Sequence, residues 1–287
     1  MKPAKCLLVT LLALGLMATA EGASTKRRAY VSGGWHVLET DNFRFCSRGR
    51  LTLSDAMLDK TEQMRSTLAD LWLGEQSPDH TWRPKCDIIL HATSEDYLKA
   101  VPGGEQTVGC SLINTAEGRV VGRRIDIRAD RPGWLHSALG HEMTHIVLAD
   151  RFADGALPAW ADEGMAVLAD PDSKQDAHFR DLRMARTQRS TFRLVELFAL
   201  SGYPSAERQA AFYGQSASLV RFLVARGTPD QFVRFMRAAA DDGYEVAVRD
   251  VYGMQGVRDL ERRWLQDVNV AYTVAKSQPL GWQSMPD

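Results

Sequence analysis

The spacing of apolar residues predicts a strand–helix–strand unit near the start of the chain. Alternating residues predict short strands at 36–38 and 43–46, separated by a turn. Apolar side chains at helical spacing predict a helix over 54–73, which Gly74 ends. The apolar run at 86–90 predicts a buried strand. This order implies a parallel pair of strands with a right-handed crossover.

The second half of the chain has mainly helical periodicity. It is preceded by a hairpin, with strands expected at 108–113 and 119–128. Helices are expected at 134–149, 158–169, 174–191, 193–200, 208–226, 229–241 and 257–275. The pattern therefore predicts an α+β fold in which a mixed α/β lobe is followed by a helical lobe.

Five segments are expected along the chain. They are a signal peptide at 1–20, a lead-in at 21–34, the α/β lobe at 35–172, the helical lobe at 173–275 and a tail at 276–287. A chain of 287 residues that is 45% hydrophobic and 25% charged has ordinary globular composition. The net charge of −1 gives no reason to expect a nucleic acid as a partner.

The N-terminus has the three parts of a secretory signal. Lys2 and Lys5 precede an apolar run at 7–17, and Ala18-Thr19-Ala20 follows as an expected cleavage site. An uncleaved membrane anchor is the alternative, but the run is short of the roughly 20 residues that span a bilayer. We therefore expect an exported protein, periplasmic or secreted, with no stable membrane insertion after cleavage.

The segment His141-Glu142-Met143-Thr144-His145 carries the candidate chemistry. Residues four apart on a helix share one face, so His141 and His145 can direct two imidazoles at one zinc ion. Glu142 then lies beside the metal and can act as general base. The alternative is that the two histidines lie on a solvated helix face. It does not explain a second carboxylate that follows further along the chain.

That carboxylate belongs to Glu163, in the predicted helix at 158–169. A catalytic zinc site needs a third protein ligand and leaves one position open. Glu163 can supply it if its helix packs against the first. Asp162 is the rival ligand, and helix phase has to decide between the two.

The segments H-E-x-T-H and P-x-W-x-x-E-G-M-A together resemble the peptidase MA-like family of secreted bacterial proteins, which have the gluzincin arrangement of zinc ligands. Seventeen residues separate His145 from Glu163, a spacing similar to that of thermolysin-like and aminopeptidase N-like enzymes. The resemblance extends from Phe43 to about Trp264. It implies Zn²⁺ bound by His141, His145 and Glu163, in a cleft between the two lobes.

Two further residues have roles that the sequence leaves open. Tyr213 lies near the start of the helix expected at 208–226 and can either stabilise an oxyanion, as gluzincin tyrosines do, or anchor the helix by packing. Asp170 can orient a ligand histidine, but a helix end at Asp170-Pro171 is the simpler explanation.

The strand that precedes the zinc helix is rich in arginine. In the gluzincin arrangement the strand over the cleft pairs with extended peptide substrate, which is one expectation for 123–128. The other is that these charges blunt an exposed sheet edge. Among the cysteines of the mature chain, we expect a Cys86–Cys110 disulfide and a free Cys46.

These observations predict a zinc metallopeptidase that hydrolyses peptide bonds of a peptide or protein substrate, with Glu142 and Tyr213 as catalytic residues. Two alternatives remain open. One is a zinc hydrolase of a non-peptide amide or ester. The other is a catalytically silent binding protein on a peptidase fold.

Overall fold

The computed structural model describes residues 27–49, 53–74 and 81–271. The expected signal peptide at 1–20 and the tail at 276–287 lie outside the described residues. Among the residues described, no helix is both long enough and apolar enough to cross a bilayer. Within the same ranges the chain forms a mixed α/β structure, which confirms the coarse fold class.

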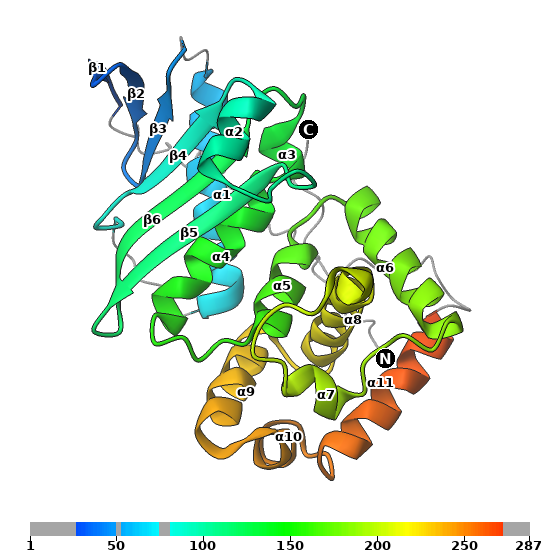
Figure 1. Ribbon diagram of the computed structural model, residues 1–287. Helices are drawn as coiled ribbons and strands as arrows, with labels where there is room; N and C mark the ends of the chain where they lie inside the picture. Colours follow the sequence, from blue (N-terminus) through cyan, green and yellow to red (C-terminus); the bar gives the residue numbers. More distant parts are fainter. Residues whose placement is uncertain (1–26, 50–52, 75–80, 272–287) are drawn as a thin grey trace, which may run out of the picture.

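A six-stranded sheet forms one side of the molecule (Figure 1). Its strands, in spatial order, are β1 (Arg28–Ser32), β2 (Trp35–Glu39), β3 (Phe43–Ser47), β4 (Cys86–His91), β6 (Arg119–Arg128) and β5 (Gly109–Ala116). The central strands β3, β4 and β6 are parallel, whereas β1, β2 and β5 add antiparallel pairs at the two sides. Of the strands described, β5 therefore forms one edge of the sheet.

Apart from the short helix Ser94–Ala100, helices cover one face of this sheet and then continue beside it (Figure 1). Those of the first half are α1 (Asp55–Leu73), α2 (Ser94–Ala100), α3 (Trp134–Ser137), α4 (Leu139–Phe152) and α5 (Ala159–Leu168). Those of the second half are α6 (Asp172–Thr187), α7 (Leu194–Phe198), α8 (Ala206–Ala225), α9 (Pro229–Asp242), α10 (Tyr244–Tyr252) and α11 (Val257–Ala271). Helix α4 packs against both the sheet and α5, and α5 packs against α8.

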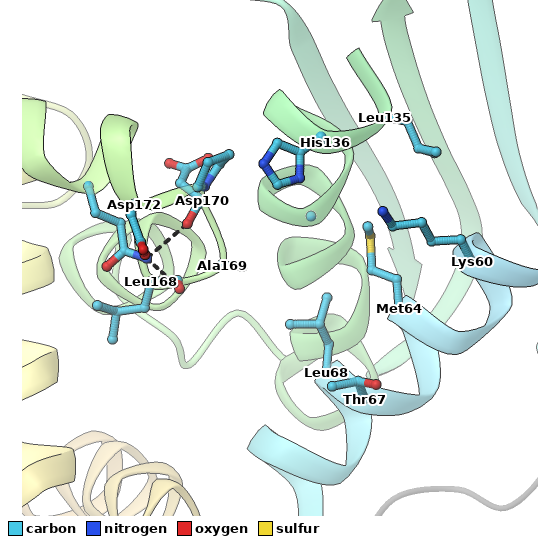
Figure 2. Close-up of a pocket in the computed structure, with 13 residues that line it drawn as sticks. Lys60, Met64, Thr67, Leu68, Leu135, His136, Leu168, Ala169, Asp170 and Asp172 are labelled. Carbon is cyan, nitrogen blue, oxygen red and sulfur yellow. Dashed lines mark hydrogen bonds between the residues drawn. The ribbon is translucent and has the colours of Figure 1, made fainter. Parts of the chain in front are cut away.

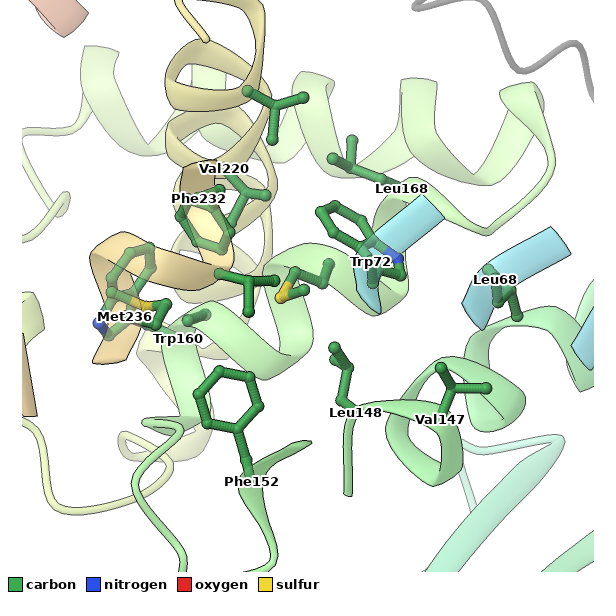
Figure 3. Packing of buried hydrophobic residues seen from close by; sticks show 14 of the residues in the cluster. Leu68, Trp72, Val147, Leu148, Phe152, Trp160, Leu168, Val220, Phe232 and Met236 are labelled. Carbon is green, nitrogen blue, oxygen red and sulfur yellow. The ribbon is translucent and has the colours of Figure 1, made fainter. Parts of the chain in front are cut away.

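One buried apolar cluster joins the sheet side to the helical side. Figure 3 shows residues of α1, α4, α5, α8 and α9 meeting in it. Trp72 of α1 and Trp160 of α5 both contact the ring of Phe232 in α9, with centroids 6.5 and 6.2 Å away. Burying such large rings removes much apolar surface from water, which stabilises the contact between the two parts. The predicted lobe boundary at 172/173 remains a prediction.

The helix predicted over 54–73 is confirmed, because its ends carry their own signals. The Ser54 side chain accepts a hydrogen bond from the Met57 amide at 3.2 Å, which satisfies one of the free donors of the first turn. Gly74 has a φ of 54° and follows the last helical residue. The parallel pair of β3 and β4 on either side of this helix is confirmed as well.

Three elements differ from the expectations. Strand β1 lies within the expected lead-in at 21–34; its mostly exposed residues show no apolar pattern, although they pair with β2. Helices α2 and α10 were not predicted. The helix expected at 134–149 is two helices, because the backbone at Ala138 leaves the helical range, with a φ of −134°.

The expectations for the arginine-rich strand are wrong. Strand β6 pairs with β4 on one side and with β5 on the other, so it neither forms an edge nor has a free side for a peptide. Its arginines are paired locally instead. Arg123 is buried and forms an ion pair with Asp150 of α4. Arg124 binds Asp126 at 2.7 Å.

The predicted Cys86–Cys110 disulfide is also wrong. Cys46, Cys86 and Cys110 are all free thiols. Strand β6 lies between the strands that carry Cys86 and Cys110. Neighbouring strands are about 4.8 Å apart, so two strands separate the cysteines by about 9.6 Å, more than the roughly 7 Å that a disulfide can bridge.

Candidate metal centre

Helix α4 presents both histidines of the H-E-x-x-H segment on one side. Its residues Leu139, Met143 and Ile146 are fully buried in the apolar cluster. His141 and His145 are one turn apart, with ring centroids 5.1 Å apart. Packing of the apolar residues thus fixes the rotation of the helix and with it the direction of the imidazoles.

Helix α5 adds Glu163 to the two histidines. Glu163 Oε2 lies 3.3 Å from His141 Nε2, and one ligand atom from each of His141, His145 and Glu163 lies within 4.8 Å of the others. Two imidazoles and one carboxylate are the donor set of many catalytic zinc sites. The structure therefore brings together the three residues predicted as ligands.

A buried carboxylate oxygen that forms no hydrogen bond lies in this cluster, 3.3 Å from His141 Nε2. Glu163 is 4% exposed, and its Oε2 atom has no hydrogen-bond partner. Such an atom is costly to bury unless a cation or a donor faces it. The donor set and this oxygen together fit a metal ion.

Two aspartates hold the outer nitrogens of the histidines. His141 Nδ1 is 3.1 Å from Asp170 Oδ2, and His145 Nδ1 is 2.8 Å from Asp162 Oδ1. A carboxylate can only accept, so each Nδ1 carries a proton and each Nε2 is the nitrogen left to face a metal. Asp162 accordingly contacts a histidine, whereas Glu163 belongs to the candidate ligand group. Asp170 orients His141, which was the alternative that the sequence did not favour.

The carboxylates around the imidazoles favour positive charge at this point. Burial acts to lower the pKa of His141, but Asp170 and Glu163 outweigh it and raise the pKa to about 10. Burial likewise opposes protonation of His145, yet Asp162 raises its pKa to about 9. Burial acts to raise the pKa of Glu163, and the two histidines lower it to about 2. A bound metal ion would supply this positive charge in place of the added protons on His141 and His145.

Glu142 lies against the first residue of the edge strand. It is 8% exposed. A Cβ atom added to Gly109 of β5 would lie 2.7 Å from Glu142 Cγ and 3.0 Å from its Oε1, closer than real Cβ contacts allow. Glycine at position 109 therefore leaves room for the Glu142 side chain between α4 and β5.

Gly164, which follows Glu163, likewise leaves room for a close contact, here between α5 and α8. A Cβ atom on Gly164 would lie 2.7 Å from the Ser216 carbonyl oxygen and 2.6 Å from Val220 Cγ2. Its absence lets α5 approach α8 closely. This packing brings Tyr213, in the same helix as Ser216, toward the candidate ligands.

Tyr213 lies within electrostatic range of the two glutamates. Burial raises the pKa of its phenol, and the charges of Glu163 and Glu142 raise it further. The phenol therefore stays protonated and able to donate at neutral pH. Its ring also packs against His178 of α6, with centroids 5.6 Å apart. The structure is thus consistent with both roles that the sequence left open.

A second tyrosine, which the sequence gave no reason to single out, contacts the site directly. The Tyr203 hydroxyl donates a hydrogen bond of 2.5 Å to Glu163 Oε1. Tyr203 lies in the segment 199–205 between α7 and α8, forty positions after Glu163. No local pattern links positions so far apart, and only the folded chain shows the contact.

A cavity of about 90 Å³ adjoins this centre (Figure 2). Its walls come from α1, α3, the start of α4 and the connection from α5 to α6, and are largely apolar. It reaches Asp170 and Gly140, but none of the three candidate ligands lines it. The cavity therefore touches the metal centre only through the residues that support it.

Comparisons with known proteins place the chain in a family. A solved structure that resembles the chain is that of an M1 zinc metallopeptidase mutant from Deinococcus radiodurans, with 15% sequence identity and a TM-score of 0.37. The match covers 91% of this chain and 54% of the other, so the chain spans about half the length of that protein. No curated protein matches the chain. The family model of the peptidase MA superfamily matches residues 115–270, which hold all three candidate ligands. With more than half of its residues matched by that model, the chain belongs to the peptidase MA superfamily.

Proposed function

We propose that this protein is a zinc-dependent peptidase of the gluzincin type, with His141, His145 and Glu163 as ligands. The observation that carries the proposal is the meeting of their three ligand atoms within 4.8 Å. Two further observations support it. Both Nδ1 atoms are engaged by aspartates, and the inward oxygen of Glu163 has no hydrogen-bond partner.

Each residue has a separate task in the proposed hydrolysis. Zinc, when bound, supplies a Lewis acid that polarises the scissile carbonyl and acidifies water. Glu142 accepts the proton of the attacking water and returns it to the leaving amine, as a general base and then a general acid. Tyr213 donates its hydroxyl proton in a hydrogen bond to the developing oxyanion. Asp162 and Asp170 keep both imidazoles in the required tautomer.

The edge strand β5 offers a place for an extended peptide. It ends the sheet among the described strands, and its first residue, Gly109, lies against Glu142. A peptide that adds to this edge by backbone hydrogen bonds would run past the proposed base. We therefore propose that β5, and not the arginine-rich strand, pairs with the substrate. Pairing along a strand edge suits a peptide better than a small acyl compound.

The proposed activity is tested with a peptide library and a panel of acyl amides and esters. Zinc-loaded wild type should cleave peptides, a chelator should abolish cleavage, and added zinc should restore it. Cleavage of the acyl panel alone would instead identify a hydrolase of non-peptide amides or esters. Zinc binding without cleavage of either set would identify a binding protein on a peptidase fold.

Replacing Tyr213 by Phe tests the role of its hydroxyl. We expect kcat to fall on the order of 10²-fold with zinc content unchanged, because one donor to the oxyanion is lost. Steady-state kinetics with a cleaved peptide, together with metal analysis, measure both quantities. An unchanged kcat would mean that the ring only packs against its neighbours, such as His178.

Export remains part of the proposal. It rests on the sequence of residues 1–20, with the basic start, apolar run and small-residue cleavage site described above. A periplasmic or secreted location would give the enzyme peptides outside the cytoplasm as substrates.

A further inference from the structure

Each candidate ligand is held by one further side chain from a different position in the chain. Asp170 holds His141 and Asp162 holds His145, both through Nδ1. Tyr203 holds Glu163 through Oε1. The first two partners lie on or directly after α5, the helix that carries Glu163 itself, whereas Tyr203 comes from a separate segment.

The contact of Tyr203 joins the surface to the buried ligand. Tyr203 is 57% exposed, whereas Glu163 is 4% exposed. Its hydroxyl occupies Oε1 at 2.5 Å, which leaves Oε2 as the oxygen that faces His141. The hydrogen bond therefore selects which carboxylate oxygen is presented to a metal and limits rotation of the carboxylate.

The same side chain also connects to the proposed oxyanion donor. The Tyr203 ring meets that of Phe212 at 6.0 Å, and Phe212 meets Tyr213 at 5.6 Å. Phe212 is fully buried, so it anchors both contacts. In addition to these ring contacts, the hydrogen bond from Tyr203 to Glu163 connects the exposed side chain of Tyr203, in the 199–205 segment, to the candidate metal centre.

We propose that Tyr203 is a positioning residue that fixes Glu163 for the metal and couples metal binding to the order of the 199–205 segment. The inference rests on the metal site of the proposed function. Coupling of this kind is reciprocal. If the hydrogen bond strengthens metal binding, a bound metal must stabilise the segment that supplies the bond.

The test compares Tyr203→Phe with wild type in the full chain, by competition for zinc against a chelator of known affinity. Loss of the hydroxyl leaves Glu163 Oε1 without its donor, and we expect the dissociation constant for zinc to rise by about 10- to 100-fold. Tyr30→Phe is the matched control. It also removes a phenol–carboxylate hydrogen bond, to Glu39 at 3.0 Å, but in strands β1 and β2 away from the centre. Its zinc affinity should equal that of wild type.

Hydrogen exchange of the 199–205 segment supplies the second readout. Zinc should slow exchange there in wild type and in Tyr30→Phe, and should have little effect in Tyr203→Phe. Circular dichroism should be the same for all three, because Tyr203 is more than half exposed. Equal zinc affinity of Tyr203→Phe and wild type, or equal protection by zinc, would overturn the inference and leave the proposed peptidase intact. A wild type that binds no zinc would overturn both.

Discussion

Replacing Glu142 by Gln is expected to slow peptide cleavage by about 10²- to 10⁴-fold, the contribution of a positioned base. Gln has nearly the same size and keeps hydrogen-bonding atoms, so it should fit beside Gly109 as Glu142 does. It cannot accept a proton at neutral pH. Because Glu142 lies outside the proposed ligand set, zinc content and fold should stay the same.

Single-turnover cleavage by zinc-loaded wild type and variant measures this loss. Glu95→Gln is a suitable control, since the Glu95 side chain is 80% exposed on α2 and takes no part in the centre. It should cleave at the wild-type rate. If zinc-loaded wild type cleaves no peptide beyond those that zinc-loaded Glu142→Gln also cleaves, the peptidase proposal fails. The binding-protein alternative then replaces it.

Alanine at His141, His145 or Glu163 is expected to remove most of the bound metal. Wild type should carry about one zinc per chain, since one group of three ligands is formed among the described residues. Loss of one of three protein ligands leaves too few donors for tight binding. It also removes the partner of an aspartate or of Tyr203, so that buried polar groups lose their hydrogen bonds.

Elemental analysis of each purified variant gives the metal content directly. His136→Ala is the matched control, because His136 precedes α4 in the short helix α3 and is not among the candidate ligands. It should retain wild-type zinc. Undiminished zinc in the three ligand variants would show that the metal is held elsewhere.

Local patterns were enough to predict single helices and the residues that they bring to the centre. Ser54 and Gly74 delimit α1 by capping, and the four-residue spacing of His141 and His145 follows from helix geometry. Glu163 could be inferred because an apolar helix pattern surrounds it. These signals act over a few residues, within the range of a single helix.

Contacts between distant segments could not be predicted in the same way. The order of β6 and β5 depends on how a hairpin joins the sheet, and this decides both the edge strand and the distance between Cys86 and Cys110. The hydrogen bond from Tyr203 to Glu163 depends on the path of the chain between α7 and α8. Neither arrangement leaves a periodic trace in the sequence.

In the proposed enzyme, the bare backbone at Gly109 would make catalysis depend on strand register. Successive side chains of a strand point to opposite faces, so a one-residue slip of β5 along β6 would bring the side chain of Val108 or Cys110 toward Glu142. An irregularity between Asn114 and Thr115 lies between the hairpin turn and this point. A slipped hairpin would leave His141, His145 and Glu163 in place. Such a protein would be folded and metal-loaded, yet its base would be displaced.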